Sequence, residues 1–349
     1  MKLNFKLLKK ISETPGVSGF EKRIRDLIIS EIKDCVDSYY VDNIGNLITF
    51  RKGKSDKKLL LAAHMDEIGF IVNYIDDKGF LYFHTLGGFD PKTLTSQRVI
   101  VHGKKDLVGV MGSKPIHVMS QEEKNKPAKI EDYFIDLGLS KKDIEKYISI
   151  GNPVSREREL IEMGNCFNGK SLDNRISVYV AIETLKNLKN KEIPFDTYTV
   201  FTVQEEVGTR GVLPATFEIQ PDFGIAIDTT IAFDVPGSRP QEQCTKLGSG
   251  TAIKLMDASV ITDSRMVEFM KKTANSHKIK WQLEMLPKGG TDTGKMQQMV
   301  KRGAIAGAIS IPTRHIHQVI ESVNKDDVAQ SINLLENCIL EIDKFDWKE

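Results

Sequence analysis

The sequence has no apolar run that approaches the roughly 20 residues a membrane-spanning helix needs. Its start, Met1 to Lys6, also lacks the apolar core of a secretory signal peptide. We therefore expect a cytoplasmic protein that does not bind a membrane. Hydrophobic residues make up 40% of the chain and charged residues 28%, a balance typical of a folded globular protein.

An excess of charge of one sign is also missing. The chain carries 49 Lys and Arg against 48 Asp and Glu, a formal net charge of +1, and it has no basic stripe. Proteins that bind nucleic acid use such an excess to neutralise phosphates. We therefore expect no nucleic-acid partner.

Cysteine is scarce, and several familiar catalytic motifs are missing. The four cysteines are far apart and form no C-x-x-C pair, which predicts reduced and mostly buried thiols. HExxH, GxSxG, P-loop and GxGxxG motifs do not occur either. The sequence thus gives no support for the chemistries that those motifs carry.

The order of segments predicts an α/β protein with an insertion. At 349 residues the chain exceeds the usual size of a single core, so two domains are expected. Strand-like and helical segments alternate in residues 1–67 and 164–349, which favours an open mixed sheet with helices on both faces. Residues 68–163 instead hold short β-like runs separated by glycine, which predicts an inserted small β-barrel or sandwich.

Two local patterns near the start of the chain predict further detail. Ser18 stands three residues before Glu21, the spacing of a capping box that opens a helix. Strand-like runs at 38–42 and 46–51 flank Asn43-Ile44-Gly45, which indicates a hairpin.

Histidines and carboxylates follow several apolar strands at the point where each strand ends. Each one alone has an ordinary explanation, because acids cap helices and follow strands routinely. Five together predict that the carboxyl ends of the strands bring them to one place. Four of the five follow strands, His64, Glu206, Asp228 and His317, and the fifth, Asp173, stands at the start of a helix that brings it to the same place; Glu205 stands next to Glu206.

This set of donors indicates a metal centre. Two imidazoles and three carboxylates suit zinc, cobalt or manganese. They suffice for two divalent ions if one carboxylate bridges. His315 lies two residues before His317 and would face the same way in an extended segment, so it is a rival ligand.

The motifs around these residues resemble those of the M42 tetrahedral aminopeptidases, a family of dinuclear metallopeptidases. Members are also described as glutamyl or deblocking aminopeptidases, and some as endoglucanases. The resemblance covers nearly the whole chain. It rests on Ala63–Gly69, Leu172–Arg175, Gln204–Gly208, Ile227–Asp228, Gly289–Gly294 and Pro312–His317.

The resemblance implies a role for each donor. Asp173 would bridge two metal ions, zinc or cobalt first and manganese as an alternative. His64 and Asp228 would complete one site, and Glu206 and His317 the other.

The resemblance also implies the reaction. Residues 1–67 and 164–349 would form the catalytic domain of an enzyme that removes amino-terminal residues from peptides. A metal-bridging water would be the nucleophile and Glu205 the general base. Asp66 would lie behind His64 and fix the tautomer of its ring.

Residues of the substrate pocket are implied with less detail. The resemblance suggests that Thr291 and Asp292 line the substrate site, whereas Arg314 is either a cation that faces the substrate or the partner of a structural carboxylate. An acidic first residue of the peptide would need a cation in this pocket. Arg210, Arg314 or Lys288 could supply it.

Two functions are alternatives to the aminopeptidase: a glycoside hydrolase and a non-catalytic peptide-binding assembly protein. A glycoside hydrolase would need two carboxyl groups and no metal, and the histidines have no place in that chemistry. A non-catalytic peptide-binding assembly protein would have no need of Glu205. By resemblance, residues 68–163 would build dimers and then a homododecamer of tetrahedral shape.

Overall fold

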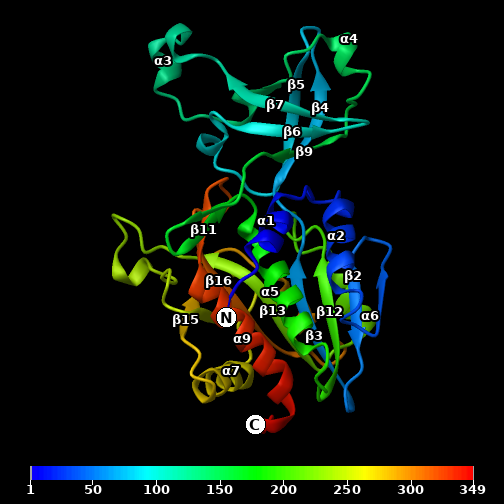
Figure 1. Ribbon diagram of the computed structural model, residues 1–349. Helices are drawn as coiled ribbons and strands as arrows, with labels where there is room; N and C mark the ends of the chain where they lie inside the picture. The colour runs from blue at the N-terminus through cyan, green and yellow to red at the C-terminus, as the bar shows by residue number, and fades with distance from the viewer. Residues whose placement is uncertain (1, 349) are drawn as a thin grey trace.

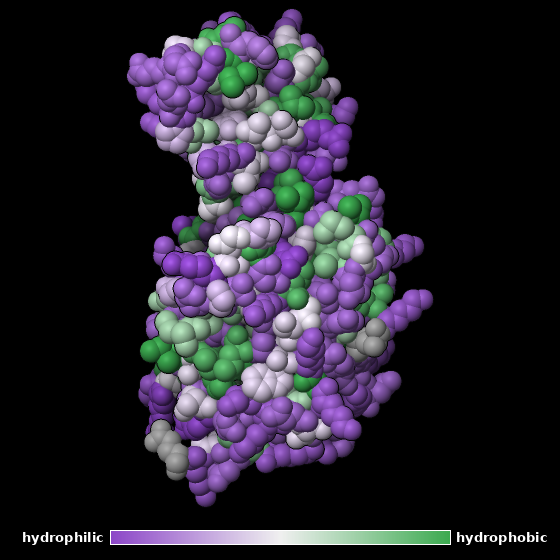
Figure 2. Space-filling model, turned by 90° about the vertical axis from the view of Figure 1, so that its left-hand side faces the viewer, coloured by the Kyte–Doolittle hydropathy of each residue, from purple (hydrophilic) through white to green (hydrophobic). Residues whose placement is uncertain are grey.

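The computed structural model describes residues 2–348, which form two lobes joined by a narrow waist (Figure 1, Figure 2). The larger lobe is built on a mixed sheet of eleven strands, and the smaller one is a closed barrel of six. This architecture confirms the predicted fold class. Within residues 2–348, no helix combines the length and the apolar character that crossing a membrane requires.

The main sheet has parallel strands at its centre. Its order is β1-β2-β12-β3-β13-β16-β17-β11-β10, and β14 and β15 extend from β16. The pairs β12–β3, β3–β13 and β13–β16 are parallel, so their carboxyl ends lie at one edge. The strands are β1 (Ser38–Val41), β2 (Leu47–Arg51), β3 (Ser55–His64), β10 (Ile161–Met163), β11 (Cys166–Gly169), β12 (Phe195–Thr202), β13 (Phe223–Ile231), β14 (Thr251–Met256), β15 (Trp281–Met285), β16 (Ile305–Arg314) and β17 (Glu321–Asn324).

Helices cover both faces of this sheet (Figure 1). One face carries α1 (Phe5–Glu13), α2 (Lys22–Ile32), α5 (Leu172–Leu188), α7 (Ser264–Ser276) and α9 (Lys325–Glu341). The other face carries α6 (Val212–Ile219) and α8 (Asp292–Gln298). Short 3-10 turns occur at Pro91–Leu94, Ile116–Val118, Ile130–Asp132, Pro240–Glu242 and Ile342–Lys344.

The apolar run of β3 is continuous because both faces of the strand are covered. Leu59, Leu61 and Ala63 pack into the core beneath α5. Leu60 and Ala62 pack into the second core beneath α6 and α8. Successive side chains of a strand point to opposite faces, so a central strand needs apolar residues at every position.

The barrel is antiparallel throughout and has its own core (Figure 1). Its strands, in order around the barrel, are β4 (Gly69–Ile75), β5 (Phe80–Leu86), β8 (Tyr133–Asp136), β7 (Asp106–Ser113), β6 (Arg98–His102) and β9 (Pro153–Arg156). The short helices α3 (Gln121–Lys124) and α4 (Lys141–Ile144) lie in its connections. The last strand within residues 68–163, β10, pairs with β11 of the main sheet and is not part of the barrel. The division of the chain into domains at residues 68 and 163 stays a prediction.

The predicted hairpin is present, but the predicted capping box is wrong. β1 and β2 pair antiparallel, with Val41 opposite Leu47. α2 begins at Lys22 without a side-chain cap, and the Ser18 hydroxyl donates instead to Asp66 Oδ2 over 2.6 Å. Glu21 Oε1 accepts the N–H groups of Gly19 and Gln204. A buried carboxylate at Asp66 requires donors, and this demand takes the hydroxyl away from the helix.

A buried ion cluster joins the end of β3 to the start of α5. Lys170 Nζ lies 2.6 Å from Glu67 Oε2, and Arg175 Nη2 lies 3.5 Å from Glu67 Oε1. All three side chains are buried. Burial alone would raise the pKa of Glu67, but the charges of Lys170 and Arg175 outweigh it and lower that pKa to about 2. The cluster thus holds an ionised carboxylate between two segments that carry predicted site residues.

Replacing Lys170 with methionine removes one of the two cations beside Glu67. Removing one partner of a buried pair leaves charge uncompensated, so we expect Lys170→Met to lose about 3 kcal/mol in the free energy of unfolding. Urea denaturation followed by circular dichroism measures this loss. Lys141→Met is the control, because Lys141 pairs with Asp77 over 2.8 Å at the surface and should change the value by less than about 0.5 kcal/mol. Equal losses in the two variants would contradict a special role for the buried cluster.

Candidate metal centre

The predicted donors come from neighbouring strand ends and one helix start. His64 ends β3, and Thr202 lies opposite it at the end of β12. Asp228 lies on β13, two residues after Ala226, which pairs with Ala62 of β3. Helical geometry is interrupted at the start of α5, where Asp173 has φ −77° and ψ 106°. Local structure therefore directs these groups to the carboxyl edge of the sheet, as the sequence predicts.

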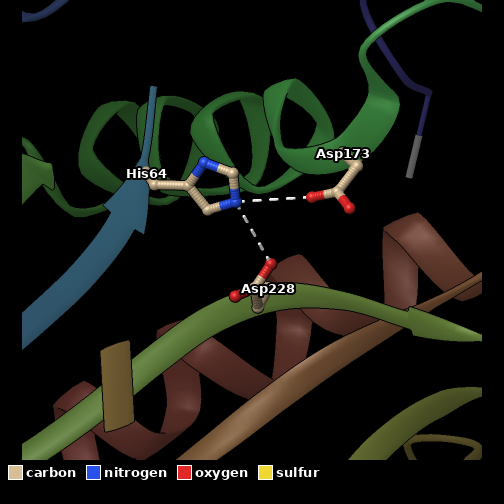
Figure 3. A group of neighbouring side chains, drawn as sticks. All are labelled: His64, Asp173 and Asp228. Carbon is tan, nitrogen blue, oxygen red and sulfur yellow. Dashed lines mark ion pairs between the residues drawn. The ribbon is translucent and has the colours of Figure 1, made fainter. Parts of the chain in front are cut away.

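Two groups of donors share one carboxylate. His64 Nε2 lies 3.3 Å from Asp173 Oδ1 and 3.6 Å from Asp228 Oδ1 (Figure 3). His317 Nε2 lies 3.5 Å from Asp173 Oδ2 and 3.2 Å from Glu206 Oε2. In each group the ligand atoms lie within 4.8 Å of one another. Asp173 thus offers one oxygen to each group, the arrangement expected of a bridging ligand.

The chemistry of these groups fits divalent cations. Each group combines an imidazole nitrogen with carboxylate oxygens, a donor set that suits zinc, cobalt or manganese. Glu206 Oε1 is buried and accepts no hydrogen bond. Burial alone would lower the pKa of His317, but its pairing with Asp173 and Glu206 raises that pKa to about 11. The same carboxylates that hold a proton on this ring would hold a metal ion there.

Asp66 lies beside His64 as predicted, and its carboxylate also binds the backbone of Glu205 and Glu206. Asp66 Oδ1 lies 3.3 Å from His64 Nδ1, without the alignment of a hydrogen bond. The same oxygen accepts the Glu205 N–H over 3.0 Å, and Oδ2 accepts the Glu206 N–H over 3.3 Å. Burial would raise the pKa of Asp66, but contacts with His64 and Ser18 outweigh it and lower that pKa. Asp66 is therefore an ionised acceptor for the backbone of both glutamates.

Glu205 and Glu206 face the same cluster although they are adjacent. β12 ends at Thr202, and Gln204 has a left-handed φ of 54°. Glu205 Oε2 lies 3.9 Å from His64 Nε2, whereas Glu206 pairs with His317. Burial raises the pKa of Glu205 well above its ordinary value, against the opposing charge of His64, and Asp228 and Glu206 add to the rise. Glu205 thus lies beside the donors and belongs to neither group.

Thr291 and Asp292 lie in the buried wall next to the donors. Asp292 Oδ2 accepts the Thr202 hydroxyl over 2.6 Å, and its Oδ1 is buried without a hydrogen-bond partner. Burial raises the pKa of Asp292 to about 7. The Thr291 hydroxyl donates to Asp257 Oδ2 over 3.0 Å. Their role in substrate binding remains a prediction.

Arg314 and His315 lie outside both groups of donors. The Arg314 guanidinium donates to both carboxylate oxygens of Asp234, each over 2.8 Å. Of the two alternatives for Arg314, the structure therefore contains the pairing with a carboxylate. Binding of substrate by Arg314 stays a prediction.

A sequence model of the M42 glutamyl aminopeptidase family matches residues 45–334. The chain belongs to this family. As an M42 aminopeptidase it is a hydrolase.

The similarity to known proteins covers nearly the whole chain. A lysyl aminopeptidase of Pyrococcus furiosus is 34% identical over 99% of this chain and 99% of its own. The structure of aminopeptidase APDkam598 from Desulfurococcus kamchatkensis has 38% identity and a TM-score of 0.92, covering 96% of this chain and 94% of that one. The TET1 peptidase of Pyrococcus horikoshii, which can assemble into a tetrahedron or a large octahedral shell, has 32% identity and a TM-score of 0.87, covering 96% and 99%.

Sequence reasoning missed three residues of this M42 site. Glu321 on β17 accepts the backbone N–H groups of Asp173 and His317. Gly88 and Arg156, both from the barrel, contact His317. No local motif marks these residues. An acidic residue at the start of the fully buried strand Glu321–Asn324 is the one available signal.

The metal content of two histidine variants tests the choice between His317 and His315. We expect the wild type to hold about two divalent ions per subunit, as in two-metal hydrolases. His317→Ala removes one donor nitrogen and should retain about one ion, whereas the neighbouring control His315→Ala should retain both. Mass spectrometry of dialysed protein measures the content. Loss of an ion from His315→Ala alone would reverse the assignment.

Proposed function

We propose that this M42 enzyme removes amino-terminal residues from peptides at a centre of two divalent metal ions, with Glu205 as the general base. The observation that carries the proposal is the sharing of Asp173 between two groups of donors. A shared carboxylate can hold two ions close enough to act on one substrate together, and a pure binding protein has no use for that arrangement.

Each donor has a place in this proposal. His64, Asp173 and Asp228 would hold one ion, and Asp173, Glu206 and His317 the other. Zinc or cobalt is the first expectation, and manganese is the alternative. When bound, such ions polarise the scissile carbonyl and lower the pKa of the attacking water.

Glu205 would carry the proton through the reaction. Its carboxylate takes a proton from the water as the carbon–oxygen bond forms, and then returns it to the amine as the carbon–nitrogen bond breaks. The distance of 3.9 Å from His64 Nε2 places the carboxylate next to the donors. Asp66 supports this position, because it accepts the N–H of Glu205.

The relatives differ in the amino-terminal residue that their names specify. The family model is named for glutamyl aminopeptidase, whereas the Pyrococcus furiosus relative is a lysyl aminopeptidase. In this chain the charge of Arg314 is already balanced by Asp234. Hydrolysis of a panel of aminoacyl fluorogenic substrates identifies the preferred residue.

The barrel offers a surface for self-association. Val108, Val110, Ile116 and Val118 are exposed apolar residues in the barrel segment, and apolar colour appears on the smaller lobe in Figure 2. The TET1 relative assembles into closed shells, which supports the same use here. We propose that twelve subunits form a tetrahedral particle. We expect sedimentation velocity at micromolar concentration to show this particle; an active monomer would contradict the proposal.

Glu205→Gln tests the catalytic role most sharply. Glutamine keeps the size of the side chain but cannot take up a proton, so we expect kcat to fall at least about 100-fold. Because Glu205 lies outside both donor groups, the variant should bind the same number of metal ions as the wild type. Peptidase assays and metal analysis on the same samples measure both quantities.

Two results would contradict this function. Near-normal turnover by Glu205→Gln would remove Glu205 as the base. Wild-type protein that cleaves cellulose after dialysis against a chelator would favour the glycosidase instead, because that chemistry needs no metal.

A further inference from the structure

His317 lies at the junction of the two lobes and is held from both sides. It follows β16, whose last residue is Arg314, and its φ of 64° is left-handed. A residue other than glycine keeps that conformation only where its surroundings fix it. Hydrogen bonds from both lobes to the backbone of His317 provide this constraint.

The main sheet holds His317 through Glu321. Glu321 Oε1 accepts the His317 N–H over 3.0 Å, and Oε2 accepts the Asp173 N–H over 2.8 Å. The Glu321 side chain is fully buried. One carboxylate therefore fixes the distance between the backbones of two predicted ligands.

The barrel holds His317 through Arg156 and Gly88. Arg156 Nη1 donates to the His317 carbonyl over 3.0 Å from the end of β9. His317 Nδ1 lies 2.9 Å from the Gly88 carbonyl oxygen, and since a carbonyl only accepts, Nδ1 carries the proton. With Nδ1 directed to Gly88, the ring faces Asp173 and Glu206 with Nε2, the nitrogen that would bind a metal ion.

The Arg156 guanidinium is itself fixed in place. Arg156 is 3% exposed, and the central carbon of its guanidinium lies 5.7 Å from the centre of the Phe89 ring. Burial raises the pKa of Glu321 to about 8, and the charge of Arg156 opposes part of that rise. Arg156 and Glu321 thus hold the backbone of His317 from the two lobes, one at its carbonyl and the other at its N–H.

Within residues 2–348, no hydrogen bond or ion pair joins the barrel to His64 or Asp228, the two donors of the other group that Asp173 completes. His64 Nδ1 faces Asp66, and both residues belong to the short segment at the end of β3. The barrel therefore contacts one histidine donor through its ring and backbone, while His64 is supported within the main lobe.

We propose that Arg156 is a positioning residue for the metal site formed by Asp173, Glu206 and His317. The barrel is then a structural part of that site as well as a surface for assembly. The inference rests on the proposed function, because it takes His317 as a metal ligand.

The test compares Arg156→Met with Arg98→Met. Arg98 lies on the neighbouring barrel strand β6 and pairs with Glu157 at the surface, so it provides a matched loss of one arginine. Loss of an outer partner of a metal ligand weakens metal binding by about 10- to 100-fold. We expect Arg156→Met to weaken one of two sites by that factor, with the other site and the Arg98→Met control unchanged.

Calorimetric titration of metal-free protein with Co²⁺, followed in parallel by visible absorption, resolves the two binding steps. kcat should fall at limiting Co²⁺ and recover at saturating Co²⁺. Arg156→Lys keeps the charge opposite Glu321 and should show a smaller loss at the same site. If Arg156→Met does not fold, Arg156→Lys alone decides between these outcomes.

Two outcomes would overturn the inference, and they differ from failure of the proposed function. Two unchanged sites in the Arg156 variants, or equal weakening of both sites, would show that Arg156 does not position His317. A wild type that binds fewer than two ions would overturn the proposed function itself, and this inference with it.

Discussion

The crowding of carboxylates at the edge of the main sheet is the constraint on which the site depends. Six carboxylates lie around two imidazoles: Asp66, Asp228 and Asp292 are buried, and the side chains of Asp173, Glu205 and Glu206 are at most 11% exposed. Burial disfavours charge, and like charges disfavour one another. The raised pKa values of Glu205, Asp292 and His317 express the same imbalance. Divalent cations correct it directly, which explains why this edge suits a metal centre better than a carboxylate-only mechanism.

Two carboxylates, Asp66 and Glu321, fix the backbone around the predicted ligands. Asp66 accepts the N–H groups of Glu205 and Glu206, and Glu321 accepts those of Asp173 and His317. Each buried acid thus receives donors that offset its loss of water. In return, the backbone positions of the predicted base and of three predicted ligands become fixed. The backbone positions of these predicted ligands are therefore held by hydrogen bonds that need no metal ion.

The sequence predicts the fold and the gathering of the donors because these follow from local patterns. The apolar run before His64 is continuous since β3 is covered on both faces, and the glycine-separated runs form the barrel. Contacts between distant segments have no such signal. Ser18 and Glu21 have the spacing of a capping box, yet Ser18 bonds Asp66, 48 positions away. Arg156 and His317 are 161 positions apart, and nothing in either segment indicates their pairing.

The place of the insertion in the chain explains why the barrel contacts the site at all. β3 ends at His64 and β4 begins at Gly69, while β9 ends at Arg156 and α5, which carries Asp173, begins at Leu172. The barrel therefore leaves and rejoins the main lobe between two predicted ligands of the metal centre. Because both connections emerge at the carboxyl edge of the sheet, segments at the base of the barrel must pass over that edge. Gly88 and Arg156 reach His317 from this position, so the barrel and the edge that carries the candidate metal centre are parts of one continuous structure.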